Sequence, residues 1–225
     1  AAFGLVLTLS LALWLKETGT RDFKALETAE IVKSFIILFK SKIFIFFTLI
    51  TLGPFAGLLC ILAGLSTVLI DFMGISTSTF GYYFAIIMLG NLLASILAGK
   101  FSNSLSSFKL IFIGAIICFL SGILAYIFAL FGVVGPLSLV VPATGFMIGF
   151  PLVVSAATAE AMAPFPAIAG KASSLIGLIQ LGTGAVVSLI LGWVSDGTHI
   201  PLVVALMFSG ILTIIPIRMV RNLNY

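Results

Sequence analysis

The sequence predicts an all-α membrane protein, and its composition and its long apolar runs carry that prediction. Hydrophobic residues make up 61% of the 225 residues and charged residues only 8%, whereas a soluble domain is about a quarter charged. The mean hydropathy is +1.34. So much apolar surface cannot be buried inside one water-soluble globule of this size, so we expect it to face lipid.

Six apolar runs are long enough to cross a bilayer as helices, which takes about 20 mainly apolar residues. The runs are continuous, whereas the strands of a membrane β-barrel are shorter and alternate apolar with polar residues, so helices are favoured. The predicted spans are residues 43–70, 80–99, 110–131, 137–159, 172–194 and 200–217. The first is longer than a bilayer requires, and Gly53 with Pro54 inside it predicts a bend, which is either a static kink or a moving joint.

The segments outside these spans complete the predicted organisation. Residues 1–15 are apolar but too short to cross a membrane alone, so we interpret them as the end of a preceding span. Residues 16–42 form the longest polar stretch, and apolar residues among its charges indicate either a short amphipathic helix at the membrane surface or a solvated linker. Residues 218–225 form a polar tail.

The positions of the basic residues predict which side of the membrane each connection faces. All 11 Lys and Arg residues fall in segments that alternate spans would place on one side, namely 16–42, 100–109, 160–171 and the tail from 218. The opposite connections contain none and are residues 71–79, 132–136 and 195–199. Because basic connections stay in the cytoplasm, the C-terminus is predicted to be cytoplasmic. The net charge of +4 thus reflects topology, and we expect no nucleic-acid partner.

The ionisable residues avoid the middle of every predicted span, where such residues usually mark ion or proton pathways. Glu160 and Lys171 fall at cytoplasmic span ends, and Asp71, Asp196 and His199 fall at the outer rim. Either a proton-coupling group lies outside this chain, or the protein is not proton-coupled.

The sequence offers no pattern for catalysis, a metal or a cofactor. Cys60 and Cys118 lie inside apolar runs, where they behave as small hydrophobic residues, and the chain has a single histidine. Phosphate-binding loops and a nucleophile paired with a base are absent from the sequence. We therefore expect no enzymatic activity, no metal and no cofactor.

Polar and aromatic side chains inside the spans are the candidate substrate contacts. Asn91 and Gln180 fall near the middle of the second and fifth spans, where each amide either lines an aqueous cavity or ties two helices together. Phe55, Phe84 and Phe150 are candidates for an apolar wall around a ligand, although most phenylalanines in such a protein face lipid or neighbouring helices.

Small residues predict where helices approach closely. Gly53 with Gly57, and Gly145 with Gly149, have the spacing that lets two helix backbones meet. This spacing suits rocking between bundles and also suits static dimerisation. The candidate packing or hinge positions are Gly53, Pro54, Gly57, Gly145, Gly149, Gly170 and Gly177.

Four segments resemble one known family. Residues 145–166 read GFMIGFPLVVSAATAEAMAPFP, residues 169–180 read AGKASSLIGLIQ, residues 68–81 read VLIDFMGISTSTFG and residues 15–18 read LKET. In that order they resemble the tenth helix and following loop, the start of helix eleven, the junction of helices seven and eight, and the end of helix six of Bcr/CflA-type drug-efflux transporters of the major facilitator superfamily. Residues 99–107 keep only a trace of the superfamily's Gly-x-x-x-Asp-Arg loop and lack its Asp.

The resemblance implies a six-helix C-terminal bundle, helices seven to twelve, preceded by the end of helix six. It implies a parent transporter of the bacterial inner membrane that exchanges protons for small amphipathic drugs by alternating access, with substrate between two six-helix halves. The partner is then an N-terminal half, outside this chain, that carries the proton-binding acids. Gln180 occupies a family motif position, which favours a cavity role for this residue.

Other functions remain open at the level of sequence. The chain is alternatively a non-transporting membrane fragment or interaction module, a six-helix unit that assembles with a second copy, or part of a metabolite permease of the same superfamily.

Overall fold

The computed structural model of the chain describes Gly4, Ser10, residues 28–194 and residues 196–221, with side chains described from 30 to 216 apart from residue 195. Apart from Gly4 and Ser10, the predicted end of a preceding span lies outside the described residues, as do residues 16–27 of the polar stretch and the last four residues of the tail. The chain divides into two compact units, residues 1–33 and residues 34–225. In the described part of the first unit, Lys33 forms an exposed ion pair with Glu30 over 3.4 Å.

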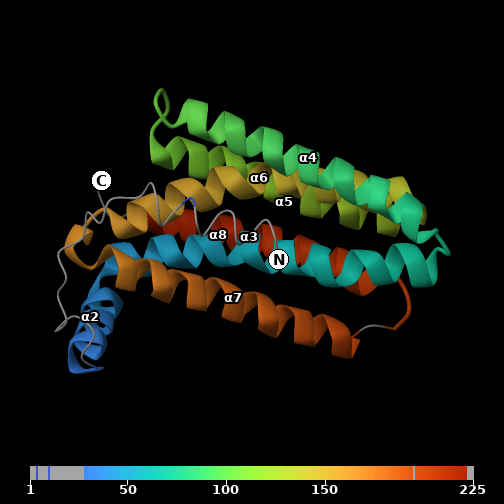
Figure 1. Cartoon of the computed structure of the whole chain (residues 1–225). Helices are drawn as coiled ribbons and strands as arrows, with labels where there is room; N and C mark the ends of the chain where they lie inside the picture. Colours follow the sequence, from blue (N-terminus) through green and yellow to red (C-terminus); the bar gives the residue numbers. More distant parts are fainter. Residues whose placement is uncertain (1–3, 5–9, 11–27, 195, 222–225) are drawn as a thin grey trace. The chain divides into compact units, whose positions relative to one another are not determined.

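The described secondary structure is entirely helical, so the all-α prediction is confirmed (Figure 1). The long helices are α2 (Thr28–Lys40), α3 (Lys42–Ser66), α4 (Thr77–Phe101), α5 (Ser107–Leu130), α6 (Pro136–Met162), α7 (Ala169–Val194) and α8 (Ile200–Arg221). A π-helical turn, η2 (Thr67–Phe72), continues α3, and a short 3-10 turn, η3 (Pro166–Ile168), precedes α7.

Five of these helical segments are long and apolar enough to cross a membrane, and a sixth apolar segment, Ile200–Pro216, is shorter. The longest is Lys42–Phe72, which joins α3 to η2 over 31 residues. At about 1.5 Å per residue this is about 45 Å, well above the roughly 30 Å of a hydrocarbon core. α3 runs through Pro54 as α-helix, and its irregular part is the π-helical turn at Thr67.

Two serines set the starts of the first two spanning helices. Ser41 is extended, with φ −81° and ψ 114°, and its hydroxyl accepts a hydrogen bond from Phe44 N over 3.3 Å. Ser76 does the same for α4, with ψ 147° and a bond of 3.3 Å from Thr79 N. A serine at this position satisfies a backbone N–H that the first turn leaves without a partner. Helix α4 therefore begins at Thr77, before the apolar run itself.

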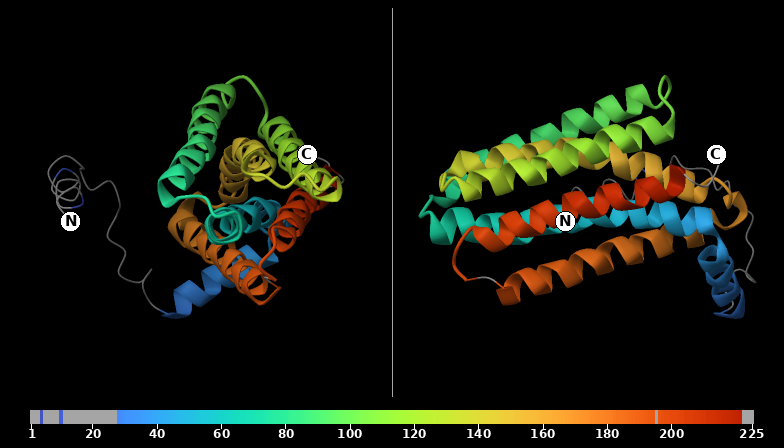
Figure 2. Two further views of the ribbon diagram at one scale, coloured as in Figure 1. Left: turned by 90° about the vertical axis from the view of Figure 1, so that its right-hand side faces the viewer. Right: turned by 180° about the vertical axis from the view of Figure 1, so that it is seen from behind.

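In the unit 34–225, α3 and α6 form the centre of the bundle (Figure 2). α5 and α8 pack together on one side of this pair, while α4 packs on α6 and α7 packs on α3. Within the described chain, α4 and α7 make no substantial packing contact with each other. The most apolar window of α6 is 61% buried and that of α4 only 17%. One side of the central pair is therefore covered by α5 and α8. The other side has one helix at each edge, α4 on α6 and α7 on α3, and we call it the flanked side.

Glycines bring the central helices close to their covered side. A Cβ added at Gly114 of α5 would lie 2.8 Å from the carbonyl oxygen of Gly149 on α6. At Gly53 of α3 it would lie 2.6 Å from the backbone nitrogen of Thr213 on α8. Real Cβ atoms do not come so close to backbone atoms, so only glycine fits at these two positions. The backbones of α5 and α6, and those of α8 and α3, are therefore in direct contact.

The other glycines singled out in the sequence have different surroundings. An added Cβ would meet the Phe146 ring at Gly57 and the Ser121 hydroxyl at Gly145. At Gly170 and Gly177 of α7 it would meet nothing within 4 Å. Among the described residues α7 packs mainly on α3, so the predicted close contact at these two positions has no partner helix there.

Candidate functional site

The flanked side of the central pair carries two aromatic rings in contact. Phe55 of α3 and Phe150 of α6 are both half-buried, and their ring centroids lie 5.3 Å apart at an interplanar angle of 61°. Gly53 faces α8, and residues two apart on a helix point about 200° from each other. Phe55 is therefore directed away from α8, towards the side between α4 and α7. We call the Phe55–Phe150 pair the aromatic floor.

Asn91 ties one flanking helix to the centre. Its side chain, half-buried on α4, donates a hydrogen bond from Nδ2 to the backbone oxygen of Met147 on α6 over 3.2 Å. The backbone oxygen of Asn91 accepts a bond from the Ser95 hydroxyl over 2.8 Å. An amide at this depth needs such a partner because lipid offers none.

Gln180 ties the other flanking helix to the centre. The side chain is 7% exposed, and Nε2 donates to Oγ1 of Thr51 on α3 over 3.1 Å. Thr51 in turn donates from Oγ1 to the backbone oxygen of Thr48 over 2.7 Å. A short chain of hydrogen bonds therefore runs from α7 into the backbone of α3.

The two amides thus have equivalent positions, each on a flanking helix and each bonded to the central helix on which it packs. The sequence left helix pairing and cavity lining open for both, and the structure places both in bonds between helices. Each amide uses one N–H in the bond described, and a side-chain amide has a second N–H and a carbonyl oxygen. Cavity lining by either amide stays a prediction, because Gln180 is almost fully buried and neither residue lines the cavity beside Phe150.

A cavity of about 520 Å³ adjoins the aromatic floor between α4, α5 and α6. Phe150, Val154 and Leu110 contribute apolar surface, and the polar lining comes from the hydroxyls of Ser95, Ser102, Ser107 and Ser155. Ser155 donates to the backbone oxygen of Pro151 over 2.6 Å, one turn earlier in its own helix. The volume is within the usual range for small-molecule sites, and the lining combines apolar walls with a few polar groups.

Comparison with known proteins shows two curated relatives. The chain is 31% identical over 183 residues to Multidrug resistance protein D of Escherichia coli (strain K12). The aligned residues make up 81% of this chain and 45% of that protein. It is 27% identical over 172 residues to Bicyclomycin resistance protein homolog of Haemophilus influenzae. Here the aligned residues make up 76% of this chain and 43% of that protein. The chain is a homologue of Bcr/CflA-type transporters of the major facilitator superfamily.

The resemblance seen in the four sequence segments is thereby confirmed. The chain spans about half the length of the curated relatives it matches. No family model matches it. Its homologues are drug transporters of the bacterial inner membrane, and the long apolar helices of this chain suit the same environment.

In this Bcr/CflA-type homologue, one of the aromatic residues predicted to contact substrate lies apart from the others. Phe84 stacks on Phe80 of the same helix, with ring centroids 5.9 Å apart, and it does not line the cavity beside Phe150. Thr51, which receives the Gln180 bond, was not singled out in the sequence. The available signal was a pair of threonines, Thr48 and Thr51, three residues apart in an otherwise apolar span.

The opposite end of the bundle from the lysines carries Asp71, Asp196 and the histidine, His199. Asp196 is exposed and its Oδ1 accepts bonds from the hydroxyl and the backbone N–H of Thr198, which lower the pKa of this carboxyl group. His199 is 8% exposed, and its ring lies 6.1 Å from that of Phe72. Among the described residues, no three His, Cys, Asp or Glu side chains are placed to hold a metal ion.

Proposed function

We propose that this chain is the C-terminal half of a secondary transporter that exports small amphipathic compounds across the bacterial inner membrane. The observation that carries this proposal is the 31% identity to Multidrug resistance protein D across 81% of the chain. The motif segments described above support the assignment to the second half. In this proposal transport proceeds by alternating access, driven by inward movement of protons.

The side of the bundle between α4 and α7 is the proposed surface for substrate and for the N-terminal half. Phe55 and Phe150 supply an apolar aromatic surface there. α4 and α7, the least buried of the five long apolar segments, would meet the partner half. The open positions at Gly170 and Gly177 support this, because a second bundle can approach them closely.

The proposed orientation puts the start of α3 in the cytoplasm. Alternating helices bring the described lysines of the unit 34–225 to that end, namely Lys40, Lys42, Lys100, Lys109 and Lys171. Asp71, Asp196 and His199 fall at the other end. Basic residues are retained on the cytoplasmic side during insertion, so the C-terminus is proposed to be cytoplasmic.

The proton carrier is proposed to lie in the N-terminal half. The described carboxylates of the bundle, at Asp71, Glu160 and Asp196, all lie at helix ends or in a turn. A carrier must exchange protons with alternating sides from a central position, and none of these three has such a position.

A resistance assay in an efflux-deficient bacterium tests the proposal. One strain expresses this chain alone, a second expresses it joined to the preceding coding region, and a third carries the joined form with Phe150→Asp as an inactive control. Membrane levels are matched by immunoblot. We expect resistance and efflux of a fluorescent amphiphile only in the second strain. Export by this chain alone would contradict the half-transporter assignment, and no export by the joined form would contradict the transport function.

A further inference from the structure

The segment of α2 from Ser34 onward has two different sides. Ser34 and Leu38 are buried, and Phe35 is half-buried. Leu38 is fully buried in the core cluster that also contains Phe44 and Phe47. This side of the helix is therefore part of the packed end of the bundle.

The opposite side of α2 is apolar and exposed. Ile36, Ile37 and Phe39 are 48%, 46% and 54% exposed. Ile36 lies about 200° around the helix from Leu38, and Lys40 lies one turn after Ile36 on the same side. Exposed isoleucine and phenylalanine beside lysine is the pattern of a helix that lies in the membrane interface.

The direction of α2 agrees with that location. The extended backbone at Ser41 separates α2 from α3. From Ser34 to Lys40 the ribbon runs across the direction of α3 rather than along it (Figure 1; Figure 2, right). In a bundle whose long helices cross the membrane, a segment at one end that runs across them lies along the membrane surface.

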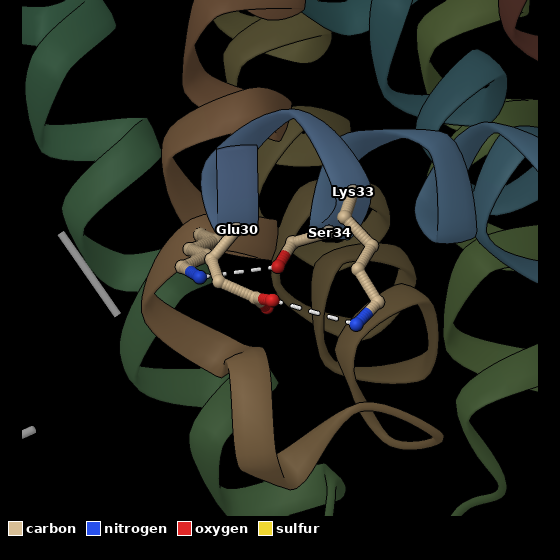
Figure 3. A network of polar contacts seen from close by, with 4 residues as sticks. Glu30, Lys33 and Ser34 are labelled. Carbon is tan, nitrogen blue, oxygen red and sulfur yellow. Dashed lines mark hydrogen bonds and ion pairs between the residues drawn. The ribbon is translucent and has the colours of Figure 1, made fainter. Parts of the chain in front are cut away.

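A part-buried hydrogen bond holds this segment in place. Lys171, in the first turn of α7, donates from Nζ to the Ser34 hydroxyl over 3.1 Å. Figure 3 shows this bond at Ser34 and, within the first unit, the ion pair of Lys33 with Glu30. The exposed side is therefore presented by a fixed element and not by a free linker.

The charge around this surface is positive. Lys40 and Lys42 are exposed, and within the described part of the chain neither forms an ion pair. Lys100 and Lys109 lie at the same end of the bundle, where the described part of the unit 34–225 has one carboxylate, Glu160. Lysines with long apolar stems reach the phosphate level of a bilayer while their helix remains among acyl chains.

We propose that the exposed side of α2, with Lys40 and Lys42, is a binding surface for anionic phospholipids. Ile36, Ile37 and Phe39 contact the upper acyl chains, and the two ammonium groups contact headgroup phosphates. A zwitterionic surface would satisfy the apolar side chains but would leave the lysines without a net opposite charge. Each lysine near an anionic surface contributes about fivefold in affinity, or about 1 kcal/mol.

The test measures which lipids surround α2 in the full-length protein reconstituted in vesicles. Ile37→Cys, in a background without other reactive cysteines, carries a bimane fluorophore. Vesicles contain phosphatidylcholine with a minor fraction of phosphatidylglycerol, and a doxyl quencher is attached to one lipid or the other. At equal quencher content we expect stronger quenching by labelled phosphatidylglycerol. We expect this preference to be lost in Lys40→Gln/Lys42→Gln.

The matched control is Lys100→Gln/Lys109→Gln, which removes two lysines from the same end of the bundle but from the last turn of α4 and the first turn of α5. We expect it to keep the preference. Equal quenching by both lipids in the unsubstituted protein would overturn the proposal, as would an equal loss in the control. Quenching by neither lipid would also overturn it, because α2 would then be covered by protein.

Discussion

Gln180 on α7 donates a hydrogen bond to Thr51 on α3, over 3.1 Å and with the glutamine almost fully buried. Asn91 on α4 makes the corresponding bond to Met147 on α6. These bonds join each flanking helix to the central helix on which it packs. Movement of a flanking helix along the centre would require its bond to break, so the two amides set the position of the helices that border the aromatic floor.

The Gln180 bond predicts an energetic coupling that a double-mutant cycle can measure. We expect Gln180→Ala and Thr51→Val each to lower the free energy of unfolding of the full-length protein in detergent. The coupling free energy between the two substitutions is expected to be about 0.6 kcal/mol. We also expect Gln180→Ala to weaken drug binding without preventing membrane insertion. Thr183→Val is the control, because among the described residues the Thr183 hydroxyl bonds only to the backbone oxygen of Ile179 in its own helix. Additive effects would show that the bond is not formed.

The contact between Gly149 and Gly114 predicts that a single methyl group is not tolerated there. Gly149→Ala places a Cβ against α5, so we expect a loss of about 1–3 kcal/mol in stability from overpacking. Gly177→Ala is the matched control on α7, where the same methyl group meets open space. Unfolding of both variants of the full-length protein in urea-containing detergent compares them. Equal stability would contradict the backbone contact between α5 and α6.

Asp71 and Asp196, at the end of the bundle proposed to face outwards, are predicted to take no part in proton coupling. The bonds from Thr198 lower the pKa of Asp196, so its carboxylate stays ionised to a lower pH than an ordinary aspartate and gains a proton only as the pH falls through that lowered value. We expect Asp71→Asn and Asp196→Asn to leave the pH dependence of transport unchanged in vesicles with an imposed gradient. Loss of the pH response in either variant would place the proton carrier in this half.

The arrangement of the lysines predicts the sidedness of the chain. A cysteine at Ser76, in the cap of α4, is expected to react with an impermeant maleimide added outside intact cells. A cysteine at Asn103, in the connection between α4 and α5, is expected to react only after the membrane is opened. Both positions are exposed, so exposure itself does not separate them. The reverse pattern would invert the proposed topology.

The spanning helices were predictable because each is a continuous apolar run, but their ends depended on single polar residues. Thr77, Ser78 and Thr79 read as a loop, yet they form the first turn of α4 because Ser76 caps it. The π-helical turn at Thr67–Phe72 continues the first helix two residues beyond the predicted span, through Asp71 and Phe72, and nothing in the sequence indicated its π-helical geometry.

Partners across the bundle were the part that the sequence did not reveal. Asn91 and Gln180 were recognised as amides that need partners, but Met147 is 56 and Thr51 is 129 positions away. Phe55 and Phe150 meet for the same reason, through the packing of α3 on α6. Such pairs follow from the packing of the bundle, which a local pattern of residues does not encode.

Protection of Phe55→Cys from alkylation by a transported drug tests most directly whether the flanked side is the substrate surface. The full-length protein carries this cysteine, or Phe112→Cys as a control at an exposed position of α5, in a background without other reactive cysteines. The variants are first shown to retain efflux. We predict that an exported drug slows alkylation at position 55 in proportion to its occupancy and leaves alkylation at position 112 unchanged. Equal rates at position 55 with and without saturating drug would contradict the account.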